Sequence, residues 1–312
     1  MVPCRAVNHA ILAVFLIIAP SVAALEMAPV APSFREIADG VHLLADLSCN
    51  IVVVTGPEGV LLIDSGYVGE VEQLKGAIAG LGAGQARVAI NTHFHFDHIG
   101  ANESLSRNGV IIIAHGRARQ NMQVEWRVPE NSLGITYGVV PAYPEEALPM
   151  LTFADAVTVH FGGHEIEVRH FPAAHSDSDS AVFLRDVNIL HTGDLYLSNG
   201  FPIIDSFHGG TIDGLIDAVD TMIDRIDDDT RVVPGHGPVS NRRELRDYRS
   251  MLAATRNRIA EMIRDGKTLE ETVAADPTAE LYGRGESWLD PKFFVWTVYE
   301  DLTRTRVKEG SR

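Results

Sequence analysis

Three histidines and an aspartate stand within six residues of one another, directly after an apolar run, and this cluster constrains the chain more than any other feature. The segment reads Thr92-His-Phe-His-Phe-Asp-His-Ile-Gly100. His93 and His95 are two residues apart, so on an extended backbone their side chains point the same way. Asp97 and His98 lie past the turn and can face a neighbouring point. Imidazoles and carboxylates are ligands of zinc and similar divalent ions, so the spacing favours two metal positions over one.

Three further candidate ligands each follow a later apolar run. His175 comes after the run that ends at residue 171, and Asp194 comes after residues 188–191. His236 lies between two glycines that allow the backbone to turn sharply. Each signal is weak alone. Together they place one more ligand at the C-terminal end of each of three predicted strands.

Short β-branched runs alternate with segments of helical periodicity through both halves of the chain. The first half is expected to contain strands at 41–45, 51–55, 60–64, 87–91 and 110–113, with helices at 68–80, near 100–107 and near 116–124. The second half is expected to contain strands at 157–160, 165–171, 180–184, 188–191 and 231–234, with helices at 212–226, 241–264, 268–275 and 291–306. Two such halves predict an α/β four-layer sandwich, in which two sheets pack face to face with helices outside.

A segment of roughly two dozen residues, 126–150, separates the halves and shows little periodicity. Long loops in compact domains often serve as functional lids. A surface insertion explains the segment equally well, so both interpretations stay open.

Residues 1–24 differ from the rest of the chain. Arg5 is the single charge before an apolar run at 10–19, which Pro20 ends, and small residues follow up to Ala24. This pattern is typical of a secretory signal peptide cut near Ala24. The run is shorter than the roughly 20 residues that span a bilayer, which argues against a membrane anchor. We therefore expect a periplasmic or secreted mature chain, 25–312, that is a single domain free of the membrane.

Cysteine content and charge narrow the expectations further. Cys4 lies in the predicted signal peptide, so Cys49 has no partner for an internal disulfide in the mature chain and is interpreted as a buried structural thiol. The chain has 42 acidic residues against 26 Lys and Arg, a formal net charge of −16. Such a surface repels phosphate backbones, so we expect a small-molecule substrate and no nucleic acid partner.

With this motif and its downstream ligands, the chain resembles the metallo-β-lactamase superfamily from about residue 35 to about residue 245. The resemblance implies an αβ/βα sandwich with a two-metal site at one edge of the sheets. It further implies two Zn²⁺ ions, with iron or manganese as other candidates, and divides the seven ligands between them. The first metal would take His93, His95 and His175, the second would take Asp97, His98 and His236, and Asp194 would bridge the pair.

The residue at the bridging position indicates which members of the superfamily the chain resembles most. The best-known β-lactamases of the superfamily carry cysteine or serine where this chain has Asp194. An aspartate there resembles hydrolases of thioesters and lactones such as glyoxalase II. The resemblance implies a hydrolase in which a metal-bridging hydroxide attacks an ester, lactone, thioester or β-lactam carbonyl. Asp97 and Asp194 would be the catalytic residues that orient this nucleophile, and β-lactam cleavage would be the weaker activity.

Two other functions remain open for the same ligands. One is an iron-dependent, sulfur-oxidising dioxygenase of the superfamily, and the other is a metal-binding accessory protein without turnover. The diiron flavoproteins carry glutamate at the position of His95, so they fit less well. The loop after Asp194 starts at the expected metal edge, so one or two of its residues are expected to touch substrate; the candidates are Tyr196, Asn199, Phe201, Phe207 and His208.

Overall fold

Strand β4 (Gly59–Ile63) is buried on both faces, which requires a layer on each side of its sheet. Leu61 and Ile63 point toward a core shared with the second sheet. Val60 and Leu62 point the other way and pack against helix α1 (Val71–Gly80). Because successive side chains of a strand point to opposite faces, β4 contributes side chains to two hydrophobic cores.

The computed structural model describes residues 32, 34–128, 138–281 and 289–310. From residue 31 onward the chain forms one compact unit. The predicted signal peptide at 1–24 lies outside the described residues and stays a prediction.

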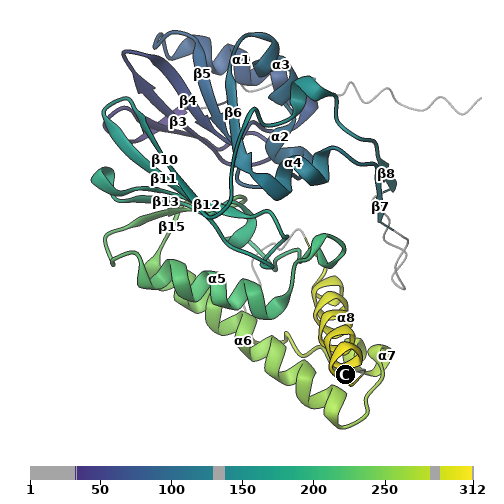
Figure 1. Ribbon diagram of the computed structural model, residues 1–312. Coiled ribbons are helices and arrows are strands. Elements are labelled where there is room, and N and C mark those ends of the chain that lie inside the picture. Colours follow the sequence, from purple (N-terminus) through teal and green to yellow (C-terminus); the bar gives the residue numbers. More distant parts are fainter. Residues whose placement is uncertain (1–31, 33, 129–137, 282–288, 311–312) are drawn as a thin grey trace, which may run out of the picture. The chain divides into compact units, whose positions relative to one another are not determined.

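Two sheets form the centre of this unit (Figure 1). The first has the order β1-β2-β3-β4-β5-β6-β9, with β1 Phe34–Ala38, β2 Val41–Leu44, β3 Ile51–Gly56, β5 Ala86–Ile90, β6 Ile111–His115 and β9 Leu151–Phe153. The second has the order β10 to β15, with β10 Ala156–Phe161, β11 His164–His170, β12 Ser180–Leu184, β13 Ile189–His191, β14 Arg231–Val233 and β15 Ser240–Asn241. Strands β4, β5, β6 and β9 run parallel to one another, and so do β13 and β14, whereas the other paired strands are antiparallel.

Helices cover the outer face of each sheet (Figure 1). Those near the first sheet are α1, α2 Phe96–Ile99, α3 Asn102–Arg107 and α4 Gly116–Met122. Those of the second half are α5 Ile212–Asp224, α6 Arg242–Arg264, α7 Leu269–Ala275 and α8 Pro291–Gly310. The predicted α/β four-layer sandwich is thereby confirmed.

The described parts of segment 126–150, residues 126–128 and 138–150, contain two strands that the sequence did not predict. They are β7 (Trp126–Val128) and β8 (Gly138–Val140), which pair antiparallel with Trp126 opposite Val140. A pair of three-residue strands is too short to produce a hydrophobic period, so the sequence showed a loop. The same shortness hid β9, which extends the first sheet, and β15, which closes the second.

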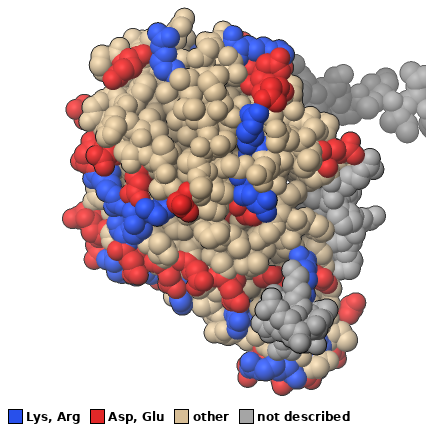
Figure 2. All heavy atoms as spheres, in the orientation of Figure 1, with Lys and Arg blue, Asp and Glu red and all other residues tan. Residues whose placement is uncertain are grey.

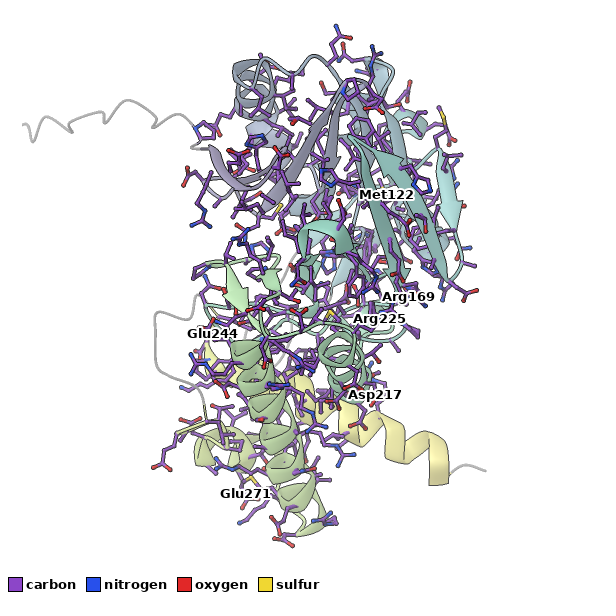
Figure 3. All side chains as sticks on the ribbon, turned by 90° about the vertical axis from the view of Figure 1, so that its left-hand side faces the viewer. Met122, Arg169, Asp217, Arg225, Glu244 and Glu271 are labelled. Atoms are coloured by element: carbon purple, nitrogen blue, oxygen red, sulfur yellow. The ribbon has the colours of Figure 1, made fainter. Side chains whose placement is uncertain are left out.

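Helices α5 and α6 carry many charged side chains. Helix α5 carries acidic residues at 213, 217, 220 and 224, and Figure 2 shows Asp and Glu gathered over this part of the molecule with Lys and Arg between them. Two of the acids pair with α6, through Arg249–Asp220 and Arg256–Asp213. On the second sheet, Glu167 accepts from Arg225, which Figure 3 places beside Arg169. Among the described helices, none is both long enough and apolar enough to cross a membrane.

Candidate metal centre

The first group of ligands consists of three imidazoles. His93 and His95 follow β5, and His175 follows β11; their ring nitrogens lie within 4.8 Å of one another. Nε2 of His175 is 2.9 Å from Nδ1 of His95. Nε2 of His93 is buried and has no hydrogen-bond partner. An unpaired buried nitrogen is costly unless something absent from the protein atoms pairs with it, and a divalent cation would do so.

Each of these rings is held by its other nitrogen. His93 Nδ1 lies 3.0 Å from Thr92 Oγ1, His95 Nε2 lies 3.0 Å from Asp205 Oδ2, and His175 Nδ1 lies 2.8 Å from the Ile203 carbonyl oxygen. Such contacts fix the tautomer and leave one nitrogen of each ring free to bind a metal.

The second group adds a carboxylate. Asp97 and His98 lie on α2, a single helical turn inside the motif, and His236 follows β14. His236 Nε2 is 3.2 Å from Asp97 Oδ2 and 3.3 Å from His98 Nε2. The sequence predicted that Asp97 and His98 face a neighbouring point, and the helical turn is the local structure that makes them do so.

Asp194 lies between the two groups, on a short 3-10 turn after β13. Its Oδ1 is 3.2 Å from His98 Nε2 and 3.4 Å from His236 Nε2. Its Oδ2 is 3.9 Å from Nε2 of both His93 and His175. The two oxygens of one carboxylate therefore face different ligand groups, which is the arrangement of a bridging ligand.

Burial and neighbouring charges shift the histidine pKa values in different directions in the two ligand groups. Burial, and then the neighbouring His95, lower the pKa of His175 to about 4, so its ring is neutral at pH 7. Burial also lowers the pKa of His93 well below its usual range. For His236, burial acts to lower the pKa, but Asp194 and Asp97 outweigh it and raise the pKa to about 10. The first group is ready to bind a cation, and the second carries a proton that a cation would displace.

The sequence of the chain matches the model of the Metallo-beta-lactamase superfamily over residues 44–236, which include the six residues of the two groups and Asp194. The chain belongs to this superfamily. The match confirms the resemblance inferred from the motif.

Solved structures of the superfamily share the fold. DIM-1 metallo-beta-lactamase is 17% identical, with a TM-score of 0.56 over 71% of this chain and 97% of that chain. A metallo-beta-lactamase from Pontibacter korlensis is 22% identical, with a TM-score of 0.55 over 71% and 99%. The inverting sec-alkylsulfatase Pisa1 from Pseudomonas sp. is 18% identical, with a TM-score of 0.62 over 86% of this chain and 50% of that chain. No curated protein matches the sequence.

Asp64 was not among the site residues predicted from the sequence. It lies behind the candidate metal ligands and contacts one of them. The residue ends β4 and is fully buried with a positive φ of 66°, a strained conformation for a non-glycine residue. Its carboxylate accepts from the Thr92 backbone N–H (2.7 Å) and lies 2.8 Å from His98 Nδ1. An aspartate at the end of an apolar strand was the available signal.

Asp205 was missed as well, because it lies in an irregular loop far from the motif. Its Oδ2 contacts both His95 Nε2 and, at 2.6 Å, His208 Nδ1. Burial opposes ionisation of Asp205, but its hydrogen bonds to His208 and His95 hold the pKa of the carboxyl below its usual range. The carboxylate thus fixes the His95 ring.

Cys49 is buried and free, as expected for a structural thiol. Its sulfur nevertheless lies within 4.8 Å of ligand atoms of Asp64 and His98. Burial raises the pKa of the thiol to about 11. It therefore stays protonated at neutral pH.

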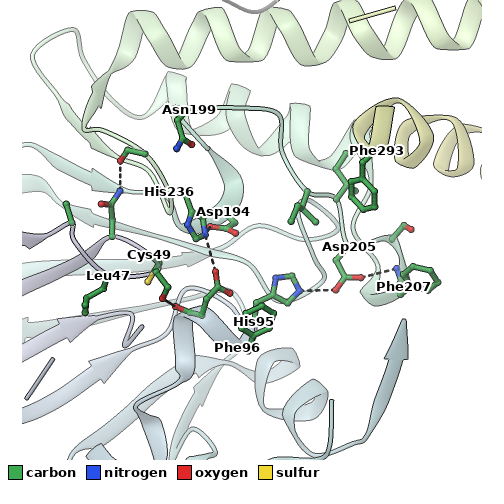
Figure 4. Close-up of a pocket in the computed structure, with 18 of the residues that line it drawn as sticks. Leu47, Cys49, His95, Phe96, Asp194, Asn199, Asp205, Phe207, His236 and Phe293 are labelled. Atoms are coloured by element: carbon green, nitrogen blue, oxygen red, sulfur yellow. Dashed lines mark hydrogen bonds and ion pairs between the residues drawn. The ribbon is translucent and has the colours of Figure 1, made fainter. Parts of the chain in front are cut away.

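A cavity of about 680 Å³ opens beside both ligand groups (Figure 4). His95, Asp97, Asp194 and His236 lie on its wall. Of the five residues proposed after Asp194, Asn199 and Phe207 line this cavity, whereas Tyr196 and Phe201 are buried in the core and His208 contacts Asp205.

Proposed function

We propose that this chain is an exported binuclear zinc hydrolase that cleaves a carbonyl substrate, either an ester, a lactone, a thioester or a β-lactam. The observation that supports the proposal most is the position of Asp194, whose two carboxylate oxygens face separate ligand groups. A small molecule is the proposed partner, because the site opens into a cavity of about 680 Å³ and the chain is strongly acidic.

The donor set suits two divalent ions. One ion would be held by His93, His95 and His175. The other would be held by Asp97, His98 and His236, and Asp194 would contact both ions. A bound pair supplies water of lowered pKa as nucleophile and stabilises negative charge on a carbonyl oxygen. Asp97 and Asp194 would orient the nucleophile, and Asp64 and Asp205 would hold the rings of His98 and His95 in place.

The location proposed for the mature protein rests on the first 24 residues. Their apolar run and small-residue end favour cleavage near Ala24 and release into the periplasm or the medium. Zinc would then bind outside the cytoplasm.

A panel of substrates tests the proposal. We expect zinc-loaded protein to hydrolyse an ester, a lactone or a thioester with a higher kcat/KM than a penicillin, a cephalosporin or a carbapenem. Chelator should abolish this activity and zinc should restore it. A kcat/KM for a lactam well above the values for the other substrates would show that the protein is a true β-lactamase. Oxygen consumption with a persulfide, or metal binding without any turnover, would instead favour the dioxygenase or the accessory protein.

The pKa values predict that the two metals leave at different pH. The pKa of His236 is about 10 in the metal-free protein, so metal binding in the second group displaces a proton and weakens as pH falls. The pKa of His175 is about 4 and that of His93 is also lowered, so protons compete with a metal at these two rings only under much stronger acid. We expect zinc content at fixed free zinc to fall in two steps as the pH is lowered from 8, with activity lost in the first step and the second step only near or below pH 4. Loss of both ions in a single step would contradict this difference.

A further inference from the structure

The cavity beside the metal ligands has an apolar wall that the C-terminal helix supplies. Phe293 and Trp296 of α8 line the cavity, together with Ile203, Ile204 and Phe207 of the loop after Asp194. Figure 4 shows Phe293 and Phe207 on the same side as Asp205. The superfamily match ends at residue 236, so α8 lies outside the segment that the match covers.

Contacts behind the wall hold it in place. Phe293 is only 4% exposed, and its ring lies 5.5 Å from that of Trp296. The next residue, Phe294, stacks on Phe201 with ring centroids 5.3 Å apart. Asp301 accepts a hydrogen bond of 2.8 Å from the Ile212 backbone N–H at the start of α5. The wall is therefore preformed, which reduces the entropy lost on binding.

Aromatic side chains continue from the wall to the cavity mouth. Phe207 is 47% exposed and Phe96 is 43% exposed, although both line the cavity. Tyr67 packs edge-to-face on Phe96, with ring centroids 5.9 Å apart. Large apolar side chains exposed around a cavity are typical of a binding site for an apolar group.

Apart from the imidazoles, the charged side chains of the described cavity lining are all acidic. Among the described residues that line the cavity, Asp97, Asp194 and Asp205 are acidic and none is Lys or Arg. Arg304 reaches the rim, where its guanidinium donates to the Ser206 carbonyl oxygen (3.0 Å) and lies 3.3 Å from Ser206 Oγ. A carboxylate held away from the reacting carbonyl would therefore find no Lys or Arg among the described lining residues, and neutral polar groups such as those of Asn50 and Asn199 would be its only hydrogen-bonding partners there besides the imidazoles. Burying a charge without a partner is strongly unfavourable.

We propose that this cavity binds an uncharged, bulky apolar group of the substrate, either an alkyl chain of medium length or an aromatic ring, and that α8 determines this preference. The inference rests on the proposed hydrolase function. A volume of about 680 Å³ accommodates such a group beside the reacting carbonyl. Substrates with a second, anionic group are selected against.

Three p-nitrophenyl esters test the preference on zinc-loaded protein: the acetate, the octanoate and the monoester of octanedioic acid. The last two have the same chain length and differ in a terminal carboxylate. We expect kcat/KM for the octanoate to exceed that for the acetate at least tenfold and that for the octanedioate about a hundredfold. An octanedioate cleaved as fast as the octanoate would overturn the proposal.

Variants assign the preference to α8. Trp296→Ala is expected to lower the octanoate-to-acetate ratio at least fivefold, and Trp296→Phe to restore part of it. Lys292→Ala, an exposed position on the same helix, should leave the ratio unchanged. Asn199→Lys places a cation at the cavity and should raise kcat/KM for the octanedioate about tenfold. An unchanged ratio in Trp296→Ala would show that α8 does not recognise the substrate.

A binding measurement distinguishes failure of this inference from failure of the hydrolase proposal. Quenching of tryptophan fluorescence reports binding of octanophenone, a neutral ketone, and of its carboxylated analogue 4-octanoylbenzoate. Binding of the neutral ketone alone, weakened in Trp296→Ala, with no ester cleaved would support the cavity assignment and refute the hydrolase. Ester cleavage without preference for the neutral probe or ester would support the hydrolase and refute the assignment.

Discussion

Replacing Asp194 with Ala is expected to lower kcat/KM about a thousandfold and to leave at most one tightly held zinc ion per chain. Its two oxygens face His98 and His236 on one side and His93 and His175 on the other, so the variant removes a ligand from both groups. Metal ions contribute several kcal/mol to transition-state stabilisation, and about 1.4 kcal/mol corresponds to a tenfold change in rate.

Asp217→Ala is the matched control for charge. This aspartate is exposed on α5, away from the cavity lining, so the variant should retain both ions and full activity. Elemental analysis and kinetics on the same preparations provide both readouts. An Asp194→Ala protein with two ions and normal turnover would show that the carboxylate does not bridge them.

Replacing Gly235 with Ala is expected to disrupt the same site without removing a ligand side chain. A Cβ at this position would collide with Oδ1 of Asp194 and lie 2.8 Å from the carbonyl carbon of Gly193. The Gly235 N–H also donates to the Gly193 carbonyl oxygen at 2.8 Å, so the two backbones are packed together and cannot move apart freely. We expect a loss of at least a hundredfold in kcat/KM, because Asp194 must move away from the ligand groups.

Gly76→Ala is the control for this substitution. No atom lies within 4 Å of the Cβ position at Gly76, which is in the middle of α1. Alanine there should raise the free energy of unfolding by about 0.5–1 kcal/mol and leave activity unchanged. Wild-type activity and metal content in Gly235→Ala would mean that the position of Asp194 is not as restricted as the packing indicates.

Local sequence patterns were sufficient to predict most of the sandwich. Runs such as 51–55 and 60–64 have the β-branched composition of buried strands, and the structure places β3 and β4 there. The short strands β7, β8, β9 and β15 were not predicted, because two or three residues carry no period. β1 was also not expected, although its partner β2 was.

The candidate ligands were visible in the sequence because their chemistry is rare and their spacing is compact. The side chains that hold the ligands were not visible. Asp64 and Asp205 contact His98 and His95 across 34 and 110 residues of chain, respectively. Only the folded chain brings such pairs together, and a single aspartate beside a strand or in a loop has no distinctive pattern.

The residues that line the cavity were harder to predict from the sequence than the candidate ligands. One or two of five loop residues were expected at the substrate, and Asn199 and Phe207 are the two that line the cavity. Trp296 was not considered, because the helix that carries it lies about a hundred residues beyond Asp194 in the chain. Its position at the cavity follows from the packing of α8 on the second half of the sandwich.

Diffraction from zinc-soaked crystals at the zinc absorption edge tests the central claim most directly. We expect two anomalous peaks per chain, one among His93, His95 and His175 and the other among Asp97, His98 and His236, with Asp194 between them. A single peak under saturating zinc, or two peaks that Asp194 does not touch, would contradict the binuclear site.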